Sequence, residues 1–431
     1  MVGGQCEMKT LLIFTLLATA AWCQQQVMDV VSYGADPTGN NDSTAALNNV
    51  FANASNATRY IPAGIYKISS TLNIDPRYKV LGAPGFSSAS SGGTTTIFAV
   101  TGFSGPMANV KAMSPQTSVV VGGMDGLFFD CRGHASVGIL YGGSATFTVY
   151  GYMTSNTVAH NCATAGAQVG QNSWELSWFN VGFQGNGGDG LQVLDQINMG
   201  ENLNCQACDI SNNGGNGVTL GPAKRGFTHH FNCIACSFDY NAAWAIQNQT
   251  VTSGESVITM VGGQIETIGA TQKWVQNFGR MTVDGAVYID DSGSGPSYLI
   301  DNENYFDANG GRFIQGPAKA VMKPGQTGFT SCLAAIGLQV MCSQFIDPAG
   351  GTNGFPNTQF SGYVSVSGAT PTMSGSIVGF GNTTGFGNGA AGTSVTTTTK
   401  NTRTGPATPQ TVVKYIEIDI GGTKYWIPLM Q

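Results

Sequence analysis

Charged side chains are scarce in this sequence. Asp, Glu, Lys and Arg make up only 10% of its 431 residues, and the formal net charge is -6. A protein that binds nucleic acid concentrates basic residues on one surface, and this composition offers no such footprint, so we expect no nucleic-acid partner. The shortage of charge does not indicate disorder, because 42% of the residues are hydrophobic. Few charges with many Gly, Ser, Thr and Asn residues are typical of an exported all-β protein.

Long apolar runs are also lacking, apart from one near the N-terminus. Leu11–Ala20 is apolar but too short to span a bilayer, and it follows the positive charge of Lys9. This pattern predicts that residues 1–23 are a signal peptide cleaved after Cys23. Acylation of Cys23, as in a lipoprotein, is disfavoured by the bulky Trp22 beside it. The expected mature protein is secreted, periplasmic or extracellular, and does not insert into a membrane.

Glycine, by contrast, is abundant, with 61 residues, and much of it falls within a sequence repeat. The period is about 27 residues, which is typical of a solenoid built from short strands and Gly/Asn turns. Each repeat places apolar residues in two columns that should face the core, and an asparagine follows the first of them. The first column holds Phe183, Ile210, Phe238 and Ile265; the second holds Leu191, Val218, Ile246 and Trp274; the asparagines are Asn186, Asn213 and Asn241.

Two segments near the N-terminus carry a family resemblance. Val30–Ala46 (VVSYGADPTGNNDSTAA) and Tyr60–Ile68 (YIPAGIYKI) resemble the N-terminal cap of pectate-lyase-like proteins of the rhamnogalacturonase/epimerase type. With the repeats, the resemblance covers roughly residues 27–320. It implies an all-β fold, namely a right-handed single-stranded parallel β-helix (a pectin-lyase-like solenoid) with an N-terminal cap and a small C-terminal β segment. The family pattern also implies that Asp36 and Asp42 are structural residues of the cap.

The composition changes towards the C-terminus and divides the chain. Residues 24–345 are expected to form the parallel β-helix domain, and residues 346–411 are a low-charge segment rich in Gly, Ser and Thr. Within 412–431, two runs of alternating apolar residues flank a Gly-Gly pair, which predicts a β-hairpin. A lone hairpin is not stable, so it must pack on the β-helix or pair with another chain. Both a monomer and a homotrimer therefore remain open.

Two Cys-X-X-Cys units imitate the ligands of a four-cysteine zinc site. Residues three apart on a straight strand face opposite sides, however, so the four sulfur atoms should not converge, and we expect no metal site. The repeat instead places Cys205 over Cys233 and Cys208 over Cys236, near the reach of disulfide bonds, which suit an exported chain. The further candidate pairs are Cys131–Cys162 and Cys332–Cys342.

Acidic residues gather on one face of the predicted β-helix. Stacked coils lie about 4.8 Å apart, and side chains alternate in and out along each strand. The residue after each inward position of the first apolar column faces outward, which places Asp239 and Glu266 in one outer column. Asp209 falls in a second outer column, one coil earlier. Nothing else in this low-charge chain brings acids together so closely.

Carboxylates in this arrangement suit the hydrolysis of a glycosidic bond. One must be protonated to donate to the leaving oxygen, the other acts as base or nucleophile, and close like charges raise one pKa. Pairs on neighbouring coils and diagonal pairs bracket the spacings of retaining and inverting enzymes, so the stereochemical outcome stays open. We therefore expect Asp209, Asp239 and Glu266 to be catalytic. The alternative is an acid ladder that is merely solvated or binds a cation.

Further candidate residues lie outside this cluster. Asp189 is expected to stack with Asn216 and Trp244, and we include it as catalytic, although its Gly-Gly-Asp-Gly setting also fits a turn that needs Gly at positive φ. Aromatic side chains are expected to stack on sugar rings as substrate-binding residues, with packing in the core or at coil edges as the alternative. These aromatic candidates are Trp174, Trp178, Tyr240 and Trp244.

The expected function is that of an exported carbohydrate-active enzyme, a glycoside hydrolase with a polysaccharide substrate and no cofactor. The motifs of catalytic family members are nevertheless missing. Polygalacturonases combine Asn-Thr-Asp, Asp-Asp, Gly-His-Gly and Arg-Ile-Lys, and pectate lyases carry Asp-His and Arg-X-Pro-X-X-Arg. Neither set is present in this sequence.

Because these family motifs are missing, two alternative functions remain open. A polysaccharide (uronate) lyase would take its base from His229, His230 or the cations at 224–225, with Ca2+ on the acid cluster to neutralise the substrate carboxylate. A non-catalytic glycan-binding surface protein, similar to a tailspike, would need none of the missing motifs. Its C-terminal hairpin would dock on the β-helix or trimerise.

Overall fold

The computed structural model describes residues 26–336, with gaps, and the two strands of the C-terminal hairpin. The chain divides into two compact units, Met1–Val340 with Phe345–Ala349 and Met341–Gln344 with Gly350–Gln431, and each is described by itself. The expected signal peptide (1–23), the segment 346–411, the cations at 224–225 and the pair Cys332–Cys342 lie outside the described residues. The gaps before residue 336 are 84–93, 112–121, 144–147, 195, 197, 222–227, 250–254, 270, 291–297, 304, 310–311, 315–319, 323–328 and 332–333.

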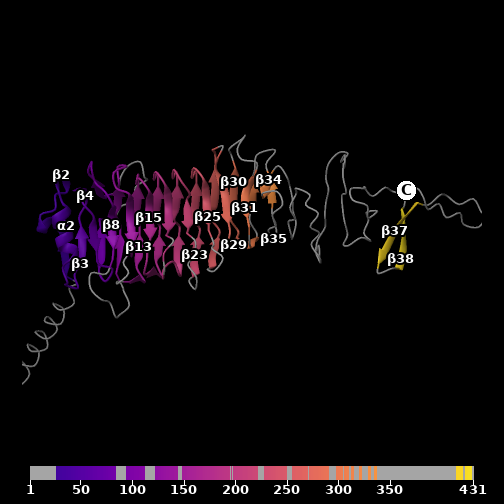
Figure 1. The fold of residues 1–431 in the computed structure, drawn as a ribbon, viewed down its shortest axis with the longest axis horizontal. Coiled ribbons are helices and arrows are strands. Elements are labelled where there is room, and N and C mark those ends of the chain that lie inside the picture. Colours follow the sequence, from indigo (N-terminus) through magenta and orange to yellow (C-terminus); the bar gives the residue numbers. More distant parts are fainter. Residues whose placement is uncertain are drawn as a thin grey trace, which may run out of the picture. The chain divides into compact units, whose positions relative to one another are not determined.

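The N-terminus of the first unit forms the expected cap (Figure 1, indigo). Asp36 shapes its loop, since its carboxylate accepts hydrogen bonds from the backbone and hydroxyl of Thr38 and from Asn41. Those bonds, with the Thr38 hydroxyl first, hold the pKa of Asp36 well below its usual range. Asp42 likewise accepts from the backbone and hydroxyl of Thr44, so both acids are structural, as the resemblance implies. The cap elements are β1 (Val27–Asp29), the 3-10 helix η1 (Val30–Tyr33), β2 (Thr38–Asp42) and α2 (Thr44–Phe51).

Three parallel sheets run along the first unit, and each coil of the chain adds one strand to each sheet (Figure 1). In the described residues the first sheet holds β1, β3 (Thr58–Ile61), β6 (Lys79–Gly82), β9 (Gly123–Asp125), β13 (Met153–Ser155), β17 (Ser177–Phe179), β20 (Leu203–Gln206), β23 (Thr228–Ile234), β26 (Glu255–Val261), β29 (Arg280–Asp284), β32 (Tyr305–Asn309) and β35 (Phe329–Ser331). The second holds β2, β4 (Gly64–Ile68), β7 (Thr95–Ala99), β10 (Phe128–Asp130), β14 (Val158–His160), β18 (Gly182–Gln184), β21 (Asp209–Ser211), β24 (Ser237–Asp239), β27 (Gln264–Thr267), β30 (Val287–Asp290), β33 (Arg312–Ile314) and β36 (Ala334–Ile336). The third holds β5 (Leu72–Ile74), β8 (Pro106–Val110), β11 (Val137–Tyr141), β15 (Ala165–Val169), β19 (Asp189–Val193), β22 (Val218–Leu220), β25 (Trp244–Asn248), β28 (Lys273–Asn277), β31 (Tyr298–Asn302) and β34 (Ala320–Met322).

The first apolar column is confirmed. Phe183 pairs with Ile210, Phe238 pairs with Ile265, and all four side chains are fully buried. The second column is wrong at its last member, because Ile246 pairs with Val275. The prediction chose Trp274, one residue earlier, which is also buried. Its indole donates to the carbonyl of Ile289, at the corner where the coil turns.

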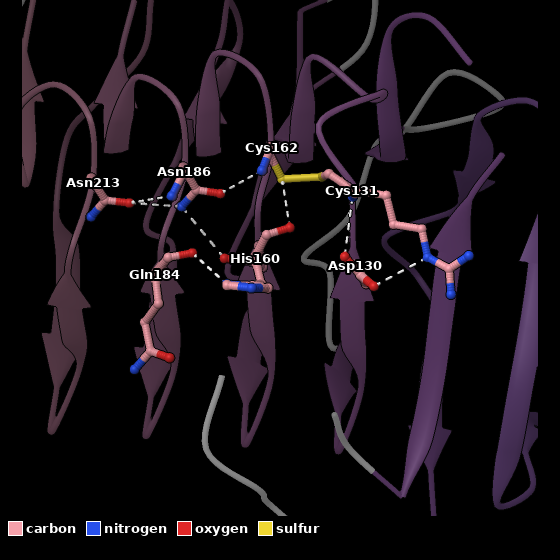
Figure 2. The surroundings of a disulfide bond; sticks show 9 residues. Asp130, Cys131, His160, Cys162, Gln184, Asn186 and Asn213 are labelled. Atoms are coloured by element: carbon pink, nitrogen blue, oxygen red, sulfur yellow. Dashed lines mark hydrogen bonds and ion pairs between the residues drawn. A yellow bond between two sulfur atoms is a disulfide. The ribbon is translucent and has the colours of Figure 1, made fainter. Parts of the chain in front are cut away.

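An asparagine ladder lies inside the turn between the second and third sheets (Figure 2). Asn186 Nδ2 donates to Asn213 Oδ1 at 2.9 Å, and Asn213 Nδ2 donates to Asn241 Oδ1 at 2.8 Å. All three side chains are buried, so each amide supplies the partner that its neighbour on the next coil needs. The repeated asparagines in the sequence therefore correspond to a ladder of hydrogen bonds between stacked coils.

The glycines near Asp189 allow neighbouring coils to approach closely, and they do not have a left-handed backbone conformation. None of the three in Gly-Gly-Asp-Gly has a positive φ, so that part of the turn interpretation is wrong. A Cβ on Gly188 would lie 2.1 Å from the carbonyl oxygen of Thr164 on the preceding coil. Glycine is required there because adjacent coils touch backbone to backbone.

The disulfide pairing differs from the prediction for the two Cys-X-X-Cys units. Cys205 does stack on Cys233, but the bonds join Cys205 to Cys208 and Cys233 to Cys236 within each coil. The prediction assumed a straight strand. The strand instead ends before Ala207, whose φ of 52° turns the chain so that both cysteines of a unit face the core.

The pair Cys131–Cys162 is confirmed. It joins the ends of β10 and β14 on neighbouring coils, with Cα atoms 4.7 Å apart (Figure 2). Among the described residues, no helix has the length and apolar character needed to cross a bilayer.

The second unit contains the expected hairpin. β37 (Lys414–Ile420) pairs antiparallel with β38 (Thr423–Leu429), and the pair Ile420 and Thr423 closes it.

Candidate functional site

The three predicted acids lie on the outer face of the second sheet, on consecutive strands. Asp209 begins β21 and pairs with Ser237 of β24, which pairs with Gln264 of β27. Asp239 ends β24 and pairs directly with Glu266 of β27. The register thus brings together the three acids that the repeat predicted as neighbours, and we call them the acid cluster.

Asp209 is partly buried against an amide side chain. Gln184 Nε2, on the preceding coil, donates to its Oδ2. Its other oxygen, Oδ1, is buried and has no hydrogen-bond partner among the described residues, and the same holds for Gln184 Oε1. Two buried acceptors are therefore left without a donor among the described residues, and a bound water molecule would satisfy such groups.

Asp239 is the acid whose protonation the surroundings change. Burial raises the pKa of its carboxyl, the hydrogen bonds from Ser237 and Gln264 lower it, and the charge of Asp209 raises it, with a net increase. Gln264 Nε2 lies 3.1 Å and 3.3 Å from the two carboxylate oxygens, and Ser237 Oγ donates to Oδ2. A carboxyl that keeps its proton above the usual pH is suited to act as a general acid.

Glu266 is oriented by Tyr240. The phenol donates to Glu266 Oε1 at 2.8 Å, and the backbone amide of Tyr240 donates to the Glu266 carbonyl at 2.9 Å. Tyr240 has a left-handed φ of 58° at the turn after β24, which directs its hydroxyl along the sheet towards the next coil. The Tyr240 hydroxyl therefore contacts the acid cluster and holds one of its carboxylates in place.

Asp189 lies on the third sheet, apart from the acid cluster. It stacks with Asn216 and Trp244 as predicted, because Asn216 N donates to Asp189 Oδ1 at 2.8 Å and Trp244 N donates to Asn216 Oδ1 at 3.0 Å. Each side chain thus satisfies a backbone amide of the next coil. This ladder favours a structural role for Asp189.

The tryptophan candidates do not form one platform. Trp178 lies in the core, only 1% exposed, with its indole donating to Tyr141, so it cannot offer a face to a sugar. Trp244, on the third sheet, carries the ammonium of Lys273 over its ring at 4.7 Å. Trp174 is partly exposed and stacked on Tyr150.

The histidines of the lyase alternative lie on the first sheet. His229 is fully buried and its Nδ1 is 2.9 Å from the carbonyl of Gly221, whereas His230 faces outward on the same strand. Only one of them is therefore accessible, as their adjacency predicts. Neither belongs to the sheet that carries the acid cluster.

Sequence reasoning missed the polar partners of the acids. Ser237 and Gln264 share the outer column of Asp209, and Gln184 precedes Asp209 by one coil. Column membership was the available signal, but only charged residues were selected from the column. Two of these uncharged residues, Ser237 and Gln264, donate to Asp239 and partly offset the increase in its pKa that burial causes.

Known proteins resemble this chain in fold rather than in sequence. No family model matches the chain, and no curated protein is similar to it. ORF18 of Geobacillus virus E2 has 16% identity and a TM-score of 0.56, covering 78% of this chain and 66% of that chain. The A-module of mannuronan C-5 epimerase AlgE4 from Azotobacter vinelandii has 13% identity and a TM-score of 0.47, covering 71% of this chain and 94% of that chain. The enzymatically active domain of tailspike protein 4 from bacteriophage CBA120 has 14% identity and a TM-score of 0.49, covering 72% of this chain and 43% of that chain.

The strand order, the register and the similarity to the viral ORF18 structure agree on one architecture. Successive parallel strands of one sheet are joined by crossovers that are right-handed in nearly all proteins. The chain therefore folds as a right-handed single-stranded parallel β-helix.

Proposed function

We propose that this protein is an exported glycoside hydrolase that cleaves a polysaccharide on the outer face of its second sheet. The observation that carries the proposal is the acid cluster itself. Asp209, Asp239 and Glu266 occupy three consecutive coils, and burial together with the charge of Asp209 raises the pKa of Asp239. Acid catalysis of this reaction requires a carboxyl that keeps its proton, and Asp239 is suited to that role.

Asp239 is the general acid in this proposal and Asp209 the general base. Asp239 gives its proton to the glycosidic oxygen as the bond to the anomeric carbon breaks. Asp209 takes a proton from a water molecule, whose oxygen forms the new bond to that carbon.

The spacing of this pair supports inversion at the anomeric carbon. Asp209 and Asp239 are one coil and two residues apart. With about 4.8 Å between coils and about 3.3 Å per residue, their Cα atoms are roughly 8 Å apart, and both side chains project from the outer face of the same sheet. Inverting enzymes need about 6.5–9.5 Å between carboxyl groups, because a water molecule must fit as well.

Glu266 has a supporting role. It lies directly beside Asp239, and the hydrogen bond from Tyr240 holds its carboxylate in place. A fixed negative charge there stabilises the positive charge that develops on the sugar ring in the transition state.

The lyase alternative has weaker support. It needs a base near the bond that breaks, and the candidate bases His229 and His230 lie on another sheet. Calcium on the acid cluster would have to compete with the donors already present, since Asp239 accepts from Ser237 and Gln264. Hydrolysis uses the same residues with their hydrogen bonds intact.

A screen on a panel of neutral and acidic polysaccharides tests the proposal. A hydrolase releases new reducing ends without an unsaturated product, whereas a lyase produces one that absorbs in the ultraviolet. Asp239→Asn and Asp209→Asn should each lower the rate of cleavage at least a hundredfold.

The matched control is Asp284→Asn, which removes an exposed acid on the first sheet and should leave cleavage unchanged. Full cleavage by Asp239→Asn would exclude the assignment of the general acid. An unsaturated product would show that the protein cleaves by elimination and not by hydrolysis.

A further inference from the structure

Two aromatic side chains are stacked where the chain passes from the third sheet to the first. Tyr150 ends β12 (Val149–Tyr150) and Trp174 ends β16 (Ser173–Trp174), and these two short strands pair with each other. The ring centroids are 5.7 Å apart and the planes differ by 10°. Tyr150 packs against the hydrophobic core, whereas Trp174 is partly exposed and lies outside that core. The core thus supports Tyr150, and Tyr150 supports Trp174.

Among the described residues of the next coil, a glycine lies opposite Trp174. Ser173 forms a parallel bridge with Met199, so the residue opposite Trp174 is Gly200. In the described part of the chain, Trp174 has no ring contact besides Tyr150, and its indole nitrogen has no hydrogen-bond partner. The indole therefore presents an apolar face and an N–H donor to solvent.

Three titratable residues follow Trp174 on successive coils. Glu175 directly follows Trp174, and its backbone amide donates to the carbonyl of Glu201 at 2.8 Å. The amide of His230, one coil further, donates to the carbonyl of Gly200 at 2.9 Å. Burial raises the pKa of Glu201, its own amide and the charge of His230 lower it, and the charge of Glu175 raises it. The two carboxylates and the imidazole therefore lie within electrostatic reach of one another.

We propose that Trp174, backed by Tyr150, forms with Glu175 and Glu201 a second glycan-binding site that takes a neutral pyranose unit. The C–H face of a pyranose packs on the indole, as apolar surfaces pack on aromatic rings. Its hydroxyl groups donate to the two carboxylates, and hydrogen bonds to charged acceptors are the stronger kind. A uronate unit would meet two like charges, so the site discriminates against acidic glycans.

This site is distinct from the acid cluster. It lies at the passage from the third sheet to the first, whereas the acids lie on the second sheet. A binding site apart from the cleaved bond holds a long polymer on the protein between cleavage events. Glycan binding at Trp174 does not depend on hydrolysis by Asp239, so the two proposals fail separately.

Binding is measured by affinity electrophoresis in a neutral glucan and in a polyuronate, with the full chain carrying Asp239→Asn so that no polymer is cleaved. The neutral polymer should retard the parent protein more strongly than the polyuronate. Adding Trp174→Ala should weaken binding of the neutral polymer about tenfold, which corresponds to the loss of one stacked aromatic contact.

The control is Phe179→Ala, which removes another exposed aromatic ring, 46% exposed, from the first sheet and should not change binding. Glu175→Gln, at an exposed position, should improve binding of the polyuronate and tests the site even where Trp174→Ala fails to fold. Unchanged binding in both Trp174→Ala and Tyr150→Ala would overturn the proposal. Tighter binding of the polyuronate than of the neutral glucan by the parent protein would also overturn it.

Discussion

Asp239 shows how uncharged neighbours set the chemistry of an acid. Ser237 and Gln264 donate to its carboxylate and favour the charged form, while burial and Asp209 favour the protonated form. Burial and the charge of Asp209 prevail, so the pKa of Asp239 is raised. The activity of a general acid falls as pH rises through its pKa, so these neighbours determine where the alkaline limb of the pH–rate profile lies.

Ser237→Ala should move that alkaline limb to higher pH. The substitution removes a hydrogen bond that lowers the pKa of Asp239, so the carboxyl keeps its proton, and with it the ability to donate, to a higher pH. The measurement is the pH dependence of kcat/KM on the polysaccharide identified in the screen. Ser211→Ala, which changes a buried hydroxyl on the preceding coil, is the control and should leave the limb in place. A shift to lower pH in Ser237→Ala would contradict the account of Asp239.

The positions of the acids could be predicted from the sequence, whereas their surroundings could not. Asp209, Asp239 and Glu266 follow from the repeat, because a fixed period places residues of successive coils in register. Hydrogen-bond partners depend on side-chain rotamers, and the period carries no information on those. Trp178 shows the same limit, since its place in the core depends on which face of its short strand points inward.

At the scale of elements, the asparagine ladder and the disulfide Cys131–Cys162 hold successive coils together. Asn213 accepts from the backbone and side chain of Asn186, and it donates to Asn241 Oδ1 and to the Phe183 carbonyl. The buried side-chain amide of Asn213 therefore takes part in four hydrogen bonds. Its removal takes a hydrogen-bond partner from groups on the coil before it and the coil after it.

Asn213→Ala should lower the free energy of unfolding by about 3 kcal/mol, because a buried polar group left without a partner costs about 1–3 kcal/mol. The matched control is Asn232→Ala, which breaks an exposed Asn–Asn contact with Asn204 on the first sheet. Its cost should be below about 0.5 kcal/mol. Denaturant unfolding of the two variants gives the comparison, and equal costs would contradict the ladder's role.

The disulfides should contribute unequally. Cys131–Cys162 closes a sequence separation of 31, whereas Cys205–Cys208 closes one of 3. In the chain-entropy model the first should stabilise the fold by about 3.5 kcal/mol and the second by about 2 kcal/mol. Replacing each pair by alanines compares them directly, because all four cysteines are buried to the same degree. A larger loss for the Cys205–Cys208 pair would contradict this order.

Errors at the element scale came from local departures from a straight strand. The φ of 52° at Ala207 turns both cysteines of one unit inward, and a period-two pattern cannot represent such a turn. Trp274 and Val275 are adjacent apolar residues and both are buried, so the apolar pattern alone does not show which of them pairs with Ile246. The inward columns of the strand centres, by contrast, could be predicted, since there the alternation holds.

At the scale of the whole molecule, the β-helix turns a one-dimensional repeat into a surface on which distant residues become neighbours. The cap motif and the period sufficed to predict this fold, because each coil repeats the same contacts with the next. Function follows less directly. The fold carries many activities, and the site depends on which outer positions hold acids and what surrounds them.

The central claim is that Asp239 and Asp209 cleave a glycosidic bond as an acid and base pair across a diagonal of two coils. The direct measurement is proton NMR of the anomeric signal immediately after cleavage of the polysaccharide found in the screen. The account predicts that the first product has the anomeric configuration opposite to that of the bond cleaved, and that Asp209→Asn forms this product at least a hundredfold more slowly. A product that retains the configuration, or cleavage by Asp209→Asn at the rate of the parent protein, would contradict it.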